Sequence, residues 1–291
     1  MAHLSQRRTE NTTGNFYVDR TCIDCDTCRW MAPDIFRSDR DQSAVFHQPT
    51  TPDERLRALQ ALLACPTASI GTVEKPEDIQ AVQQSFPIPV TETVFHCGYH
   101  AESSFGAASY LILRPEGNIL VDSPRFAPPL VKRLEAMGGV RYLYLTHRDD
   151  VADHQKFHDH FGCDRLLHED DLASSTRNIE KPLSGTDPIS LEPDLTLIPV
   201  PGHTKGHTVL LYRNQVLFSG DHLAWSDDLQ HLIAFRRACW YSWPIQIQSM
   251  KTLLDYSFEW VLPGHGRRYH TTHPTMHQAL EHCIAWMEKN P

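Results

Sequence analysis

The stretch THRDDVADH, residues 146–154, directly follows the β-rich run 141–145 and is the polar run that decides the fold. Three further polar runs also follow strand-like segments: PGHTKGH at 201–207, SGD at 219–221 and PGHG at 263–266. Side chains placed just beyond the carboxyl ends of neighbouring strands meet at one edge of a sheet. Because neutral imidazole and carboxylate bind divalent ions together, the sequence predicts a metal site at that edge.

Strand-like and helical segments alternate over the larger, carboxyl-terminal part of the chain. A hairpin is predicted at 109–114 and 118–122, where two β-rich runs are separated by Pro-Glu-Gly. Further strands are expected at 141–145, 195–200, 208–212, 216–218 and 260–262, and helices at 128–137, 151–161, 245–254 and 274–287. Short strands mixed with helices favour an α/β fold with mixed sheets covered by helices.

Residues 92–291 resemble the metallo-β-lactamase-fold superfamily of metallohydrolases, because the four polar runs occur in that family's order. The resemblance implies an αββα sandwich with one or two metal ions at its edge. It implies His147 and His203 as ligands of the first metal, Asp153, His154 and His265 as ligands of the second, and Asp221 as the bridge.

The signature HxHxDH of that superfamily is altered in this chain. Asp149 stands where the second His is expected, and two extra residues precede the Asp-His pair. If Asp149 points inward, the first site becomes His147, Asp149 and His203, and this donor set suits non-haem iron as well as zinc. The diiron oxygen reductases of the superfamily are similar, since they also carry a carboxylate at that position. Alternatively, Asp150 is the inward carboxylate.

A second inorganic site is predicted from the cysteines near the amino end. Cys22, Cys25 and Cys28 follow one another at two-residue spacing, and Cys65-Pro66 lies far downstream. Three such thiolates plus a remote fourth bind one 4Fe–4S cluster. A four-thiolate zinc site or a disulfide pair is the alternative, although zinc sites commonly use two separate CxxC pairs and disulfides belong mainly to secreted proteins.

Residues 15–73 resemble the single-cluster bacterial-type ferredoxins, which implies a small α+β domain whose terminal segments pair. The composition agrees with two domains, since only two of the 18 histidines lie in residues 1–75. The stretch 76–91 is rich in proline and polar residues, as linkers are. We therefore expect a ferredoxin-like domain at 1–75, a linker at 76–91 and a metallo-β-lactamase-fold domain at 92–291.

The net charge and the hydropathy of the chain exclude some classes of binding partner and some cellular locations. The formal net charge is −9, which disfavours nucleic acid or anionic lipid as the main partner. No apolar stretch approaches the roughly 20 residues of a membrane span, and residues 1–8 lack the apolar core of a secretory signal. Thiolate ligands favour a reducing compartment, cytoplasm or organelle stroma. The expected partners are a small-molecule substrate and a possible redox partner protein.

The function expected from these features is metal-dependent hydrolysis, in which a metal-bound hydroxide attacks an ester, thioester, lactone or phosphoester. Asp153 would orient the nucleophile and Asp221 would hold two metals together, so both are predicted catalytic residues. The expected cofactors are one 4Fe–4S cluster and one or two divalent ions, zinc or iron. Two alternatives stay open: a redox enzyme whose ferredoxin domain passes electrons to a non-haem iron site, and a redox-responsive binding protein with a degenerate metal site.

Overall fold

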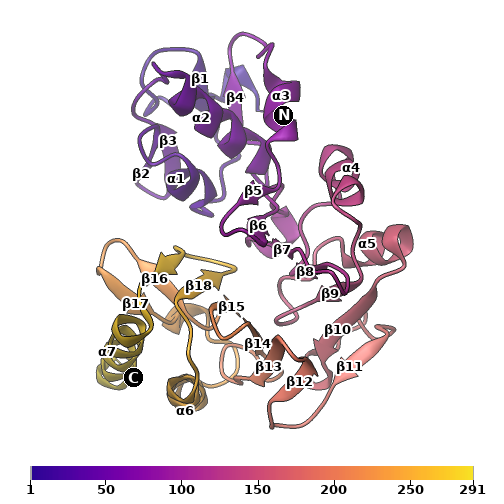
Figure 1. Ribbon diagram of the computed structural model, residues 1–291. Coiled ribbons are helices and arrows are strands. Elements are labelled where there is room, and N and C mark those ends of the chain that lie inside the picture. Colours follow the sequence, from indigo (N-terminus) through magenta and orange to yellow (C-terminus); the bar gives the residue numbers. More distant parts are fainter. Residues whose placement is uncertain (1, 291) are drawn as a thin grey trace. The chain divides into compact units, whose positions relative to one another are not determined.

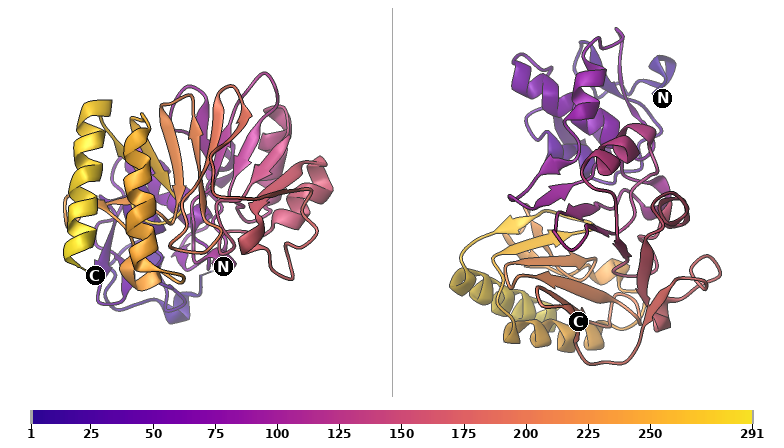
Figure 2. Two further views of the ribbon diagram at one scale, coloured as in Figure 1. Left: turned by 90° about the horizontal axis from the view of Figure 1, so that it is seen from below. Right: turned by 45° about the vertical axis from the view of Figure 1, so that its right-hand side comes forward.

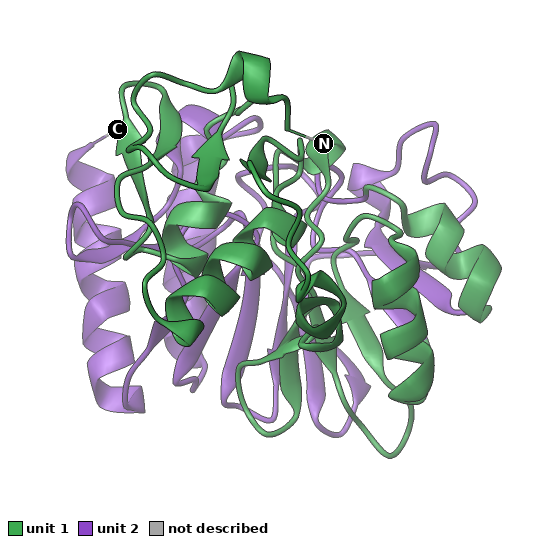
Figure 3. Cartoon of the chain, turned by 90° about the horizontal axis from the view of Figure 1, so that it is seen from above, with its two compact units in different colours: residues 1–141, 152–162 green, residues 142–151, 163–291 purple. Residues whose placement is uncertain are grey.

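A computed structural model describes residues 2–290, which divide into two compact units (Figure 3). The first unit consists of Met1–Arg141 and Ala152–Gly162, and the second of Tyr142–Val151 and Cys163–Pro291. The expected linker at 76–91 lies inside the first unit, and the division into two domains at that point stays a prediction. No helix within residues 2–290 is both long and apolar enough to cross a lipid bilayer.

The amino-terminal part of the first unit is small and mixed (Figure 1). Its elements are β1 (Phe16–Val18), α1 (Thr27–Met31), β2 (Phe36–Asp39), β3 (Gln42–Val45), α2 (Pro52–Ala64) and β4 (Ile70–Thr72). β1 and β4 pair antiparallel, with Phe16 opposite Thr72, which confirms the expected pairing of the terminal segments. α2 begins with a capping box, because the Thr51 side chain accepts from the Glu54 N–H and the Glu54 side chain accepts from the Thr51 N–H.

The rest of the first unit carries four successive antiparallel strands and three helices. They are α3 (Ile79–Gln84), β5 (Ile88–Pro89), β6 (Val94–His96), β7 (Tyr110–Ile112), β8 (Ile119–Val121), α4 (Pro128–Ala136) and α5 (His154–Phe161). The β7–β8 hairpin is confirmed. The helix expected from residue 151 begins only at His154, because Ala152 has a positive φ of 28° that no helix accommodates.

The second unit contains parallel and antiparallel strands. β9 (Tyr142–Tyr144), β10 (Asp164–His168) and β11 (Lys181–Leu183) pair in parallel. A six-stranded sheet has the order β12 (Ile189–Glu192), β13 (Leu195–Pro199), β14 (Thr208–Tyr212), β15 (Val216–Gly220), β18 (Trp260–Pro263) and β19 (Tyr269–His270). The hairpin β16 (Ala224–Ser226) and β17 (His231–Ile233) precedes the helices α6 (Trp243–Thr252) and α7 (His273–Lys289).

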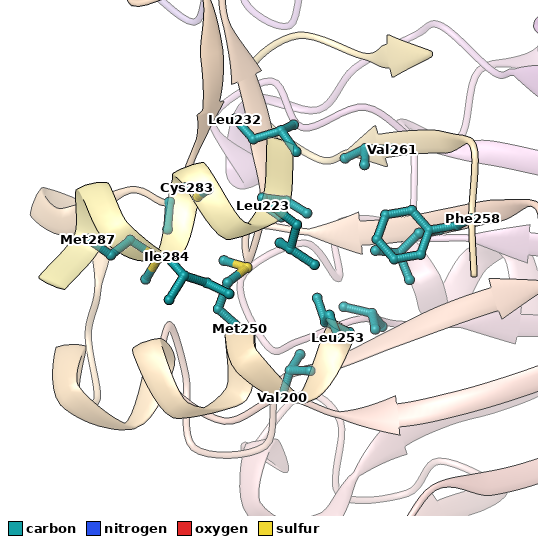
Figure 4. Close-up of a cluster of buried hydrophobic side chains, with 14 of the residues drawn as sticks. Val200, Leu223, Leu232, Met250, Leu253, Phe258, Val261, Cys283, Ile284 and Met287 are labelled. Atoms are coloured by element: carbon teal, nitrogen blue, oxygen red, sulfur yellow. The ribbon is translucent and has the colours of Figure 1, made fainter. Parts of the chain in front are cut away.

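The core of the second unit lies between the six-stranded sheet and its two helices. Helices α6 and α7 lie side by side (Figure 2), and their apolar faces meet sheet residues such as Val261 (Figure 4). Met276, Leu280 and Met287 recur at helical spacing along α7 and are buried. Burying each such side chain stabilises the fold by about 1.5–3 kcal/mol, so the strands that carry the polar loops are firmly held.

Two of the polar runs begin just after β9 and β13, and the other two begin in the last residues of β15 and β18. The segment after β9 is joined directly to the first residue of β14, because the Thr208 N–H donates to the Thr146 carbonyl at 2.9 Å. The Tyr144 hydroxyl also lies 2.8 Å from the Thr208 hydroxyl. The start of β14 therefore holds the segment that leads from β9 to His147.

Candidate metal centres

The four cysteines predicted to bind the cluster line one small pocket in the first unit. They come from the loop before α1, from α1 itself and from the residue that ends α2, and they are Cys22, Cys25, Cys28 and Cys65. None of the four forms a disulfide. The loop turns tightly through Asp24 and Asp26, which have positive φ values of 60° and 69° that short polar residues tolerate. Four thiols around one pocket fit a 4Fe–4S cluster.

Backbone donors surround the cysteine sulfurs. The Ser43 N–H points to Cys22 Sγ at 3.5 Å, and the Ser69 N–H donates to Cys65 Sγ at 3.2 Å. Hydrogen bonds to ligand sulfurs stabilise a bound cluster and adjust its reduction potential. The pocket therefore supplies outer-sphere donors as well as thiols.

The charge around the pocket also favours a bound cluster. Burial raises the pKa of the Cys25 thiol to about 11, and it raises the pKa of Cys28 further. These thiols stay protonated at neutral pH unless a metal centre stabilises the thiolates. Arg29 pairs with both Asp24 and Asp26, so the acids of the loop add little negative charge beside the four sulfurs.

Three imidazoles and three carboxylates gather in the second unit. They are His147, Asp149, Asp150, His203, Asp221 and His265. One set of ligand atoms, from His147, Asp149 and His203, lies within 4.8 Å of one another, and a second set comes from His147, Asp150 and Asp221. Both acids that the sequence left as alternatives, Asp149 and Asp150, therefore reach the cluster of side chains.

Asp221 lies between these groups. Its Oδ2 is 3.8 Å from Nε2 of His147 and 3.7 Å from Nε2 of His203, and its Oδ1 is 2.8 Å from Nδ1 of His265. A Cβ added to Gly264 would lie 2.6 Å from Asp150 Oδ2 and 3.0 Å from Asp221 Oδ1. Only glycine lets the loop after β18 approach the two carboxylates this closely.

The buried histidines are suited to binding a metal ion. His147 and His203 are 0% and 1% exposed, and neither Nε2 makes a hydrogen bond to any residue among 2–290. A buried polar atom without a partner costs about 1–3 kcal/mol, and a metal ion would satisfy both nitrogens. The Thr146 hydroxyl lies 2.9 Å from Nδ1 of His147, where it can accept the ring proton and leave Nε2 to a metal.

The electrostatics keep this donor set in its metal-binding form. Burial lowers the pKa of His147 to about 4, although the nearby Asp221 opposes the shift. Burial alone would raise the pKa of Asp221, but His265, His147 and His203 together hold it below its usual range. Contact with His203 lowers the pKa of Asp149. At neutral pH the His147 imidazole is therefore neutral and the Asp149 and Asp221 carboxylates are ionised, as metal ligands must be.

Asp153 and His154 belong to the first unit, and their predicted roles as ligands, and that of Asp153 in catalysis, stay predictions. One Asp153 oxygen accepts the Phe126 N–H at 2.8 Å, and the other pairs with Lys156 at 2.8 Å. Burial raises the pKa of Asp153, and Lys156 and the Phe126 N–H outweigh it, so the net pKa is lowered. His154 is buried at the start of α5.

Two further buried histidines lie beside the second-unit centre. The His207 ring stacks on the His147 ring with 4.8 Å between centroids, and its Nε2 accepts the Asp221 N–H at 3.2 Å. The rings of His207 and His222 are 5.7 Å apart. Burial lowers the pKa of His222 to about 3 and that of His207 well below its usual value. Both imidazoles are therefore neutral and lie beside the predicted ligands, and sequence reasoning did not single out His222.

Sequence reasoning also missed Asp171, which organises two of the ligand loops. It is fully buried and accepts hydrogen bonds from the Thr204 hydroxyl at 2.5 Å, the Gly206 N–H at 2.8 Å and the Arg148 N–H at 3.1 Å. The donors flank His203 and His147. The sequence around Asp171 does not predict this role, because all three donors are distant from Asp171 in the sequence.

Asp171→Asn should weaken metal binding without removing a ligand. In the variant, an amide NH₂ replaces one carboxylate oxygen, and this group cannot accept hydrogen bonds from the surrounding N–H and O–H donors. The loop that carries His203 therefore loses a hydrogen bond that holds it in place. Outer-sphere substitutions of this kind cost about 10- to 100-fold in metal affinity. Competition with a chelator measures the change, and Asp170→Asn, an exposed neighbour paired with Lys205, is the matched control. Equal affinities in the two variants would contradict this role.

The family described as the 4Fe-4S single cluster domain of Ferredoxin I matches residues 18–72. The chain shares 17% identity, with a TM-score of 0.53, with the mono-zinc form of the metallo-β-lactamase FIM-1 from Pseudomonas aeruginosa, covering 69% of this chain and 94% of that one. The chain shares 18% identity, with a TM-score of 0.52, with the DIM-1 metallo-β-lactamase, covering 70% of this chain and 96% of that one.

A metallo-β-lactamase from Pontibacter korlensis gives 19% identity and a TM-score of 0.50, covering 69% of this chain and 97% of that one. No curated protein matched the chain. Identities this low extend to the fold alone. The chain therefore carries a ferredoxin-type 4Fe–4S domain and a metallo-β-lactamase fold, and both resemblances inferred from the sequence are confirmed.

Proposed function

We propose that this chain, which joins a ferredoxin-type 4Fe–4S domain to a metallo-β-lactamase fold, is a metal-dependent hydrolase. The observation that carries the proposal is the pair of ligand groups that share His147. Asp221 reaches toward the imidazoles of both His203 and His265, which supports its predicted role as the bridge between two ions. Nitrogen and oxygen donors alone, with no thiolate, suit zinc or iron.

The residues suggest how such a site would act on an ester, thioester, lactone or phosphoester. A divalent ion bound there would lower the pKa of a water toward about 7 and polarise the bond to be cleaved. Asp149 is 42% exposed, so solvent reaches it and it would be able to accept the proton of an attacking water. His265 is 21% exposed and can face the developing charge.

An exposed aromatic side chain lies beside His203. The Trp240 side chain is 60% exposed, and the backbone N–H of Trp240 donates to the His203 carbonyl at 2.8 Å. The two rings are 6.3 Å apart between centroids. An exposed indole beside a predicted ligand supports a substrate whose acyl or alcohol part is apolar.

A redox enzyme is the second candidate, because Asp149 and Asp150 both reach the centre. Three carboxylates with three imidazoles are a harder donor set than histidines alone, and such sets bind iron well. The 4Fe–4S domain of the same chain would then supply single electrons, and a redox partner protein would reduce it. In the hydrolase proposal no electrons are consumed, so the cluster is structural or senses the redox state. Buried thiolate ligands support a reducing compartment, such as the cytoplasm or an organelle stroma, for either candidate.

Metal analysis of anaerobically purified protein, combined with turnover assays, tests the proposal. We expect one or two divalent ions beyond the four cluster irons, and hydrolysis of aryl or alkyl esters, thioesters, lactones or phosphodiesters that is lost on chelation and restored by zinc or iron. Removing the metal should leave the cluster spectrum unchanged.

Two other results would contradict the hydrolase proposal. Non-cluster iron with oxygen or peroxide consumption that depends on a reductant, and no hydrolysis, would favour the redox enzyme. An intact fold without any metal beyond the cluster would contradict both candidates and favour a redox-responsive binding protein.

A further inference from the structure

The cysteine pocket is completed by a segment that lies well beyond the ferredoxin motif. The backbone N–H of His100 donates to the carbonyl of Ala64, the residue before Cys65, at 3.1 Å. A Cβ added to Gly106 would lie 2.9 Å from Cys25 Cβ and 3.0 Å from its Sγ. Gly106 also has a φ of +84°, which favours glycine. Residues 100–106 therefore pack directly against the cysteine loop within the first unit.

A chain of hydrogen-bonding groups connects this segment to one cysteine. Thr27 Oγ1 is 3.4 Å from Cys25 Sγ and 3.2 Å from Nδ1 of His100. Nε2 of His100 is in turn 2.8 Å from Nε2 of His96. Thr27, His96 and His100 are each only 1% exposed. These hydrogen-bonding groups thus connect the Cys25 sulfur with a buried pair of imidazoles.

The direction of these hydrogen bonds follows from the acceptors. Nδ1 of His100 lies 2.5 Å from the Gly106 carbonyl, and a carbonyl can only accept, so Nδ1 carries the proton. A neutral His100 then presents Nε2 as an acceptor, and His96 must donate through its own Nε2. A thiolate on Cys25 is a stronger acceptor than the Gly106 carbonyl, which is 3.4 Å from Thr27 Oγ1. The Thr27 hydroxyl therefore donates to the sulfur.

The indole of Trp30 helps to hold this arrangement. Its ring lies 5.0 Å from the His96 ring and 6.0 Å from the His100 ring, measured between centroids. The Tyr110 ring packs on His96 from β7 at 6.0 Å. Because the two imidazoles are packed on several sides, their nitrogens stay aligned with Thr27.

We propose that Thr27 and His100 are positioning residues that set the reduction potential of the 4Fe–4S cluster. When a one-electron donor reduces the cluster, negative charge grows on the ligand sulfurs, and no bond forms or breaks. The Thr27 hydroxyl stabilises that charge by donating to Cys25 Sγ, and it is polarised by the Nδ1–H of His100, which the Gly106 carbonyl at 2.5 Å and Thr27 Oγ1 at 3.2 Å share. Burial strengthens the effect, because hydrogen bonds are electrostatically stronger in a low-dielectric interior. This inference does not depend on hydrolysis.

Thr27→Val tests the first link, because it removes the hydroxyl and keeps the shape. The potential of the intact, cluster-loaded chain is measured at one pH by redox titration followed with electron paramagnetic resonance. We expect reduction to become at least tenfold less favourable, a shift of about 59 mV to more negative potential for one electron. Thr27→Ser, which keeps the hydroxyl, should restore the original potential.

The matched control is Thr67→Val. Thr67 Oγ1 is 3.8 Å from Cys65 Sγ, but it is held by the Ser69 hydroxyl at 2.6 Å rather than by a histidine. Its removal should shift the potential clearly less. If Thr27→Val does not load the cluster, Thr27→Ala removes the same hydroxyl without any added bulk and gives the same test.

His100→Leu tests the second link, and His100→Asn is its partner because an amide can still donate from near the Nδ1 position. His100→Leu should shift the potential in the same direction as Thr27→Val. The double variant should show less than the sum of the two shifts, since the residues act through one chain. Unchanged potentials in Thr27→Val and His100→Leu, or shifts equal to that of Thr67→Val, would overturn the proposal.

Discussion

Asp221→Asn should empty the second-unit centre of at least one metal ion and lower hydrolysis by about 10³-fold or more, which is about 4 kcal/mol of transition-state stabilisation. Asp221 is the carboxylate that faces His147, His203 and His265 at 3.8, 3.7 and 2.8 Å. The amide keeps the side-chain volume but removes the charge that offsets the bound cations, and it places a donor where an acceptor is needed. Metal content and kcat/KM are the two measurements.

Asp227→Asn is the matched control for this variant. Asp227 is 57% exposed and pairs with Arg267 outside the centre, so its substitution should leave metal content and turnover unchanged. Unfolding should stay cooperative in both variants, since neither change removes packed volume. Full metal content and full turnover in Asp221→Asn would contradict the assignment of the bridge and, with it, the proposed two-ion centre.

The second large effect is expected from Cys65→Ala, which should abolish the cluster absorbance and its paramagnetic signal entirely. Cys65, at the end of α2, is the one predicted cluster ligand that lies outside residues 22–28. Residues 18–72 form a small block with a limited core, and blocks of this size commonly need a metal or disulfide staple. We therefore also expect rapid proteolysis within 18–72.

Cys239→Ser is the control, because this cysteine is only partly buried and a serine keeps the hydrogen bond that its Sγ donates to the Gly202 carbonyl. It should leave the cluster intact. The cluster-free variant also separates the candidate functions: hydrolysis that persists in Cys65→Ala supports the hydrolase, whereas loss of reductant-dependent turnover supports the redox enzyme. Retention of the cluster by Cys65→Ala would contradict its role as the fourth ligand.

The sequence by itself determined the types of donor and the strands that carry them. The cysteine spacing predicted the cluster domain, and the polar runs after strands predicted a second centre. Both inferences can be made from the sequence because strand periodicity and ligand spacing are local properties of the chain. The start of α5 was misplaced by three residues, because the conformation of Ala152 is set by its surroundings rather than by helix propensity.

Only the tertiary structure decided which side chains meet. The sequence left open whether Asp149 or Asp150 points inward, and the structure brings both to His147, since each orientation depends on loop dihedrals that propensity does not fix. Asp171 gains its role from donors about 23 to 35 residues away in sequence. The same holds for His100, whose contact with Thr27 spans 73 residues. Local pattern thus supplies the ligands, and long-range packing selects and orients them.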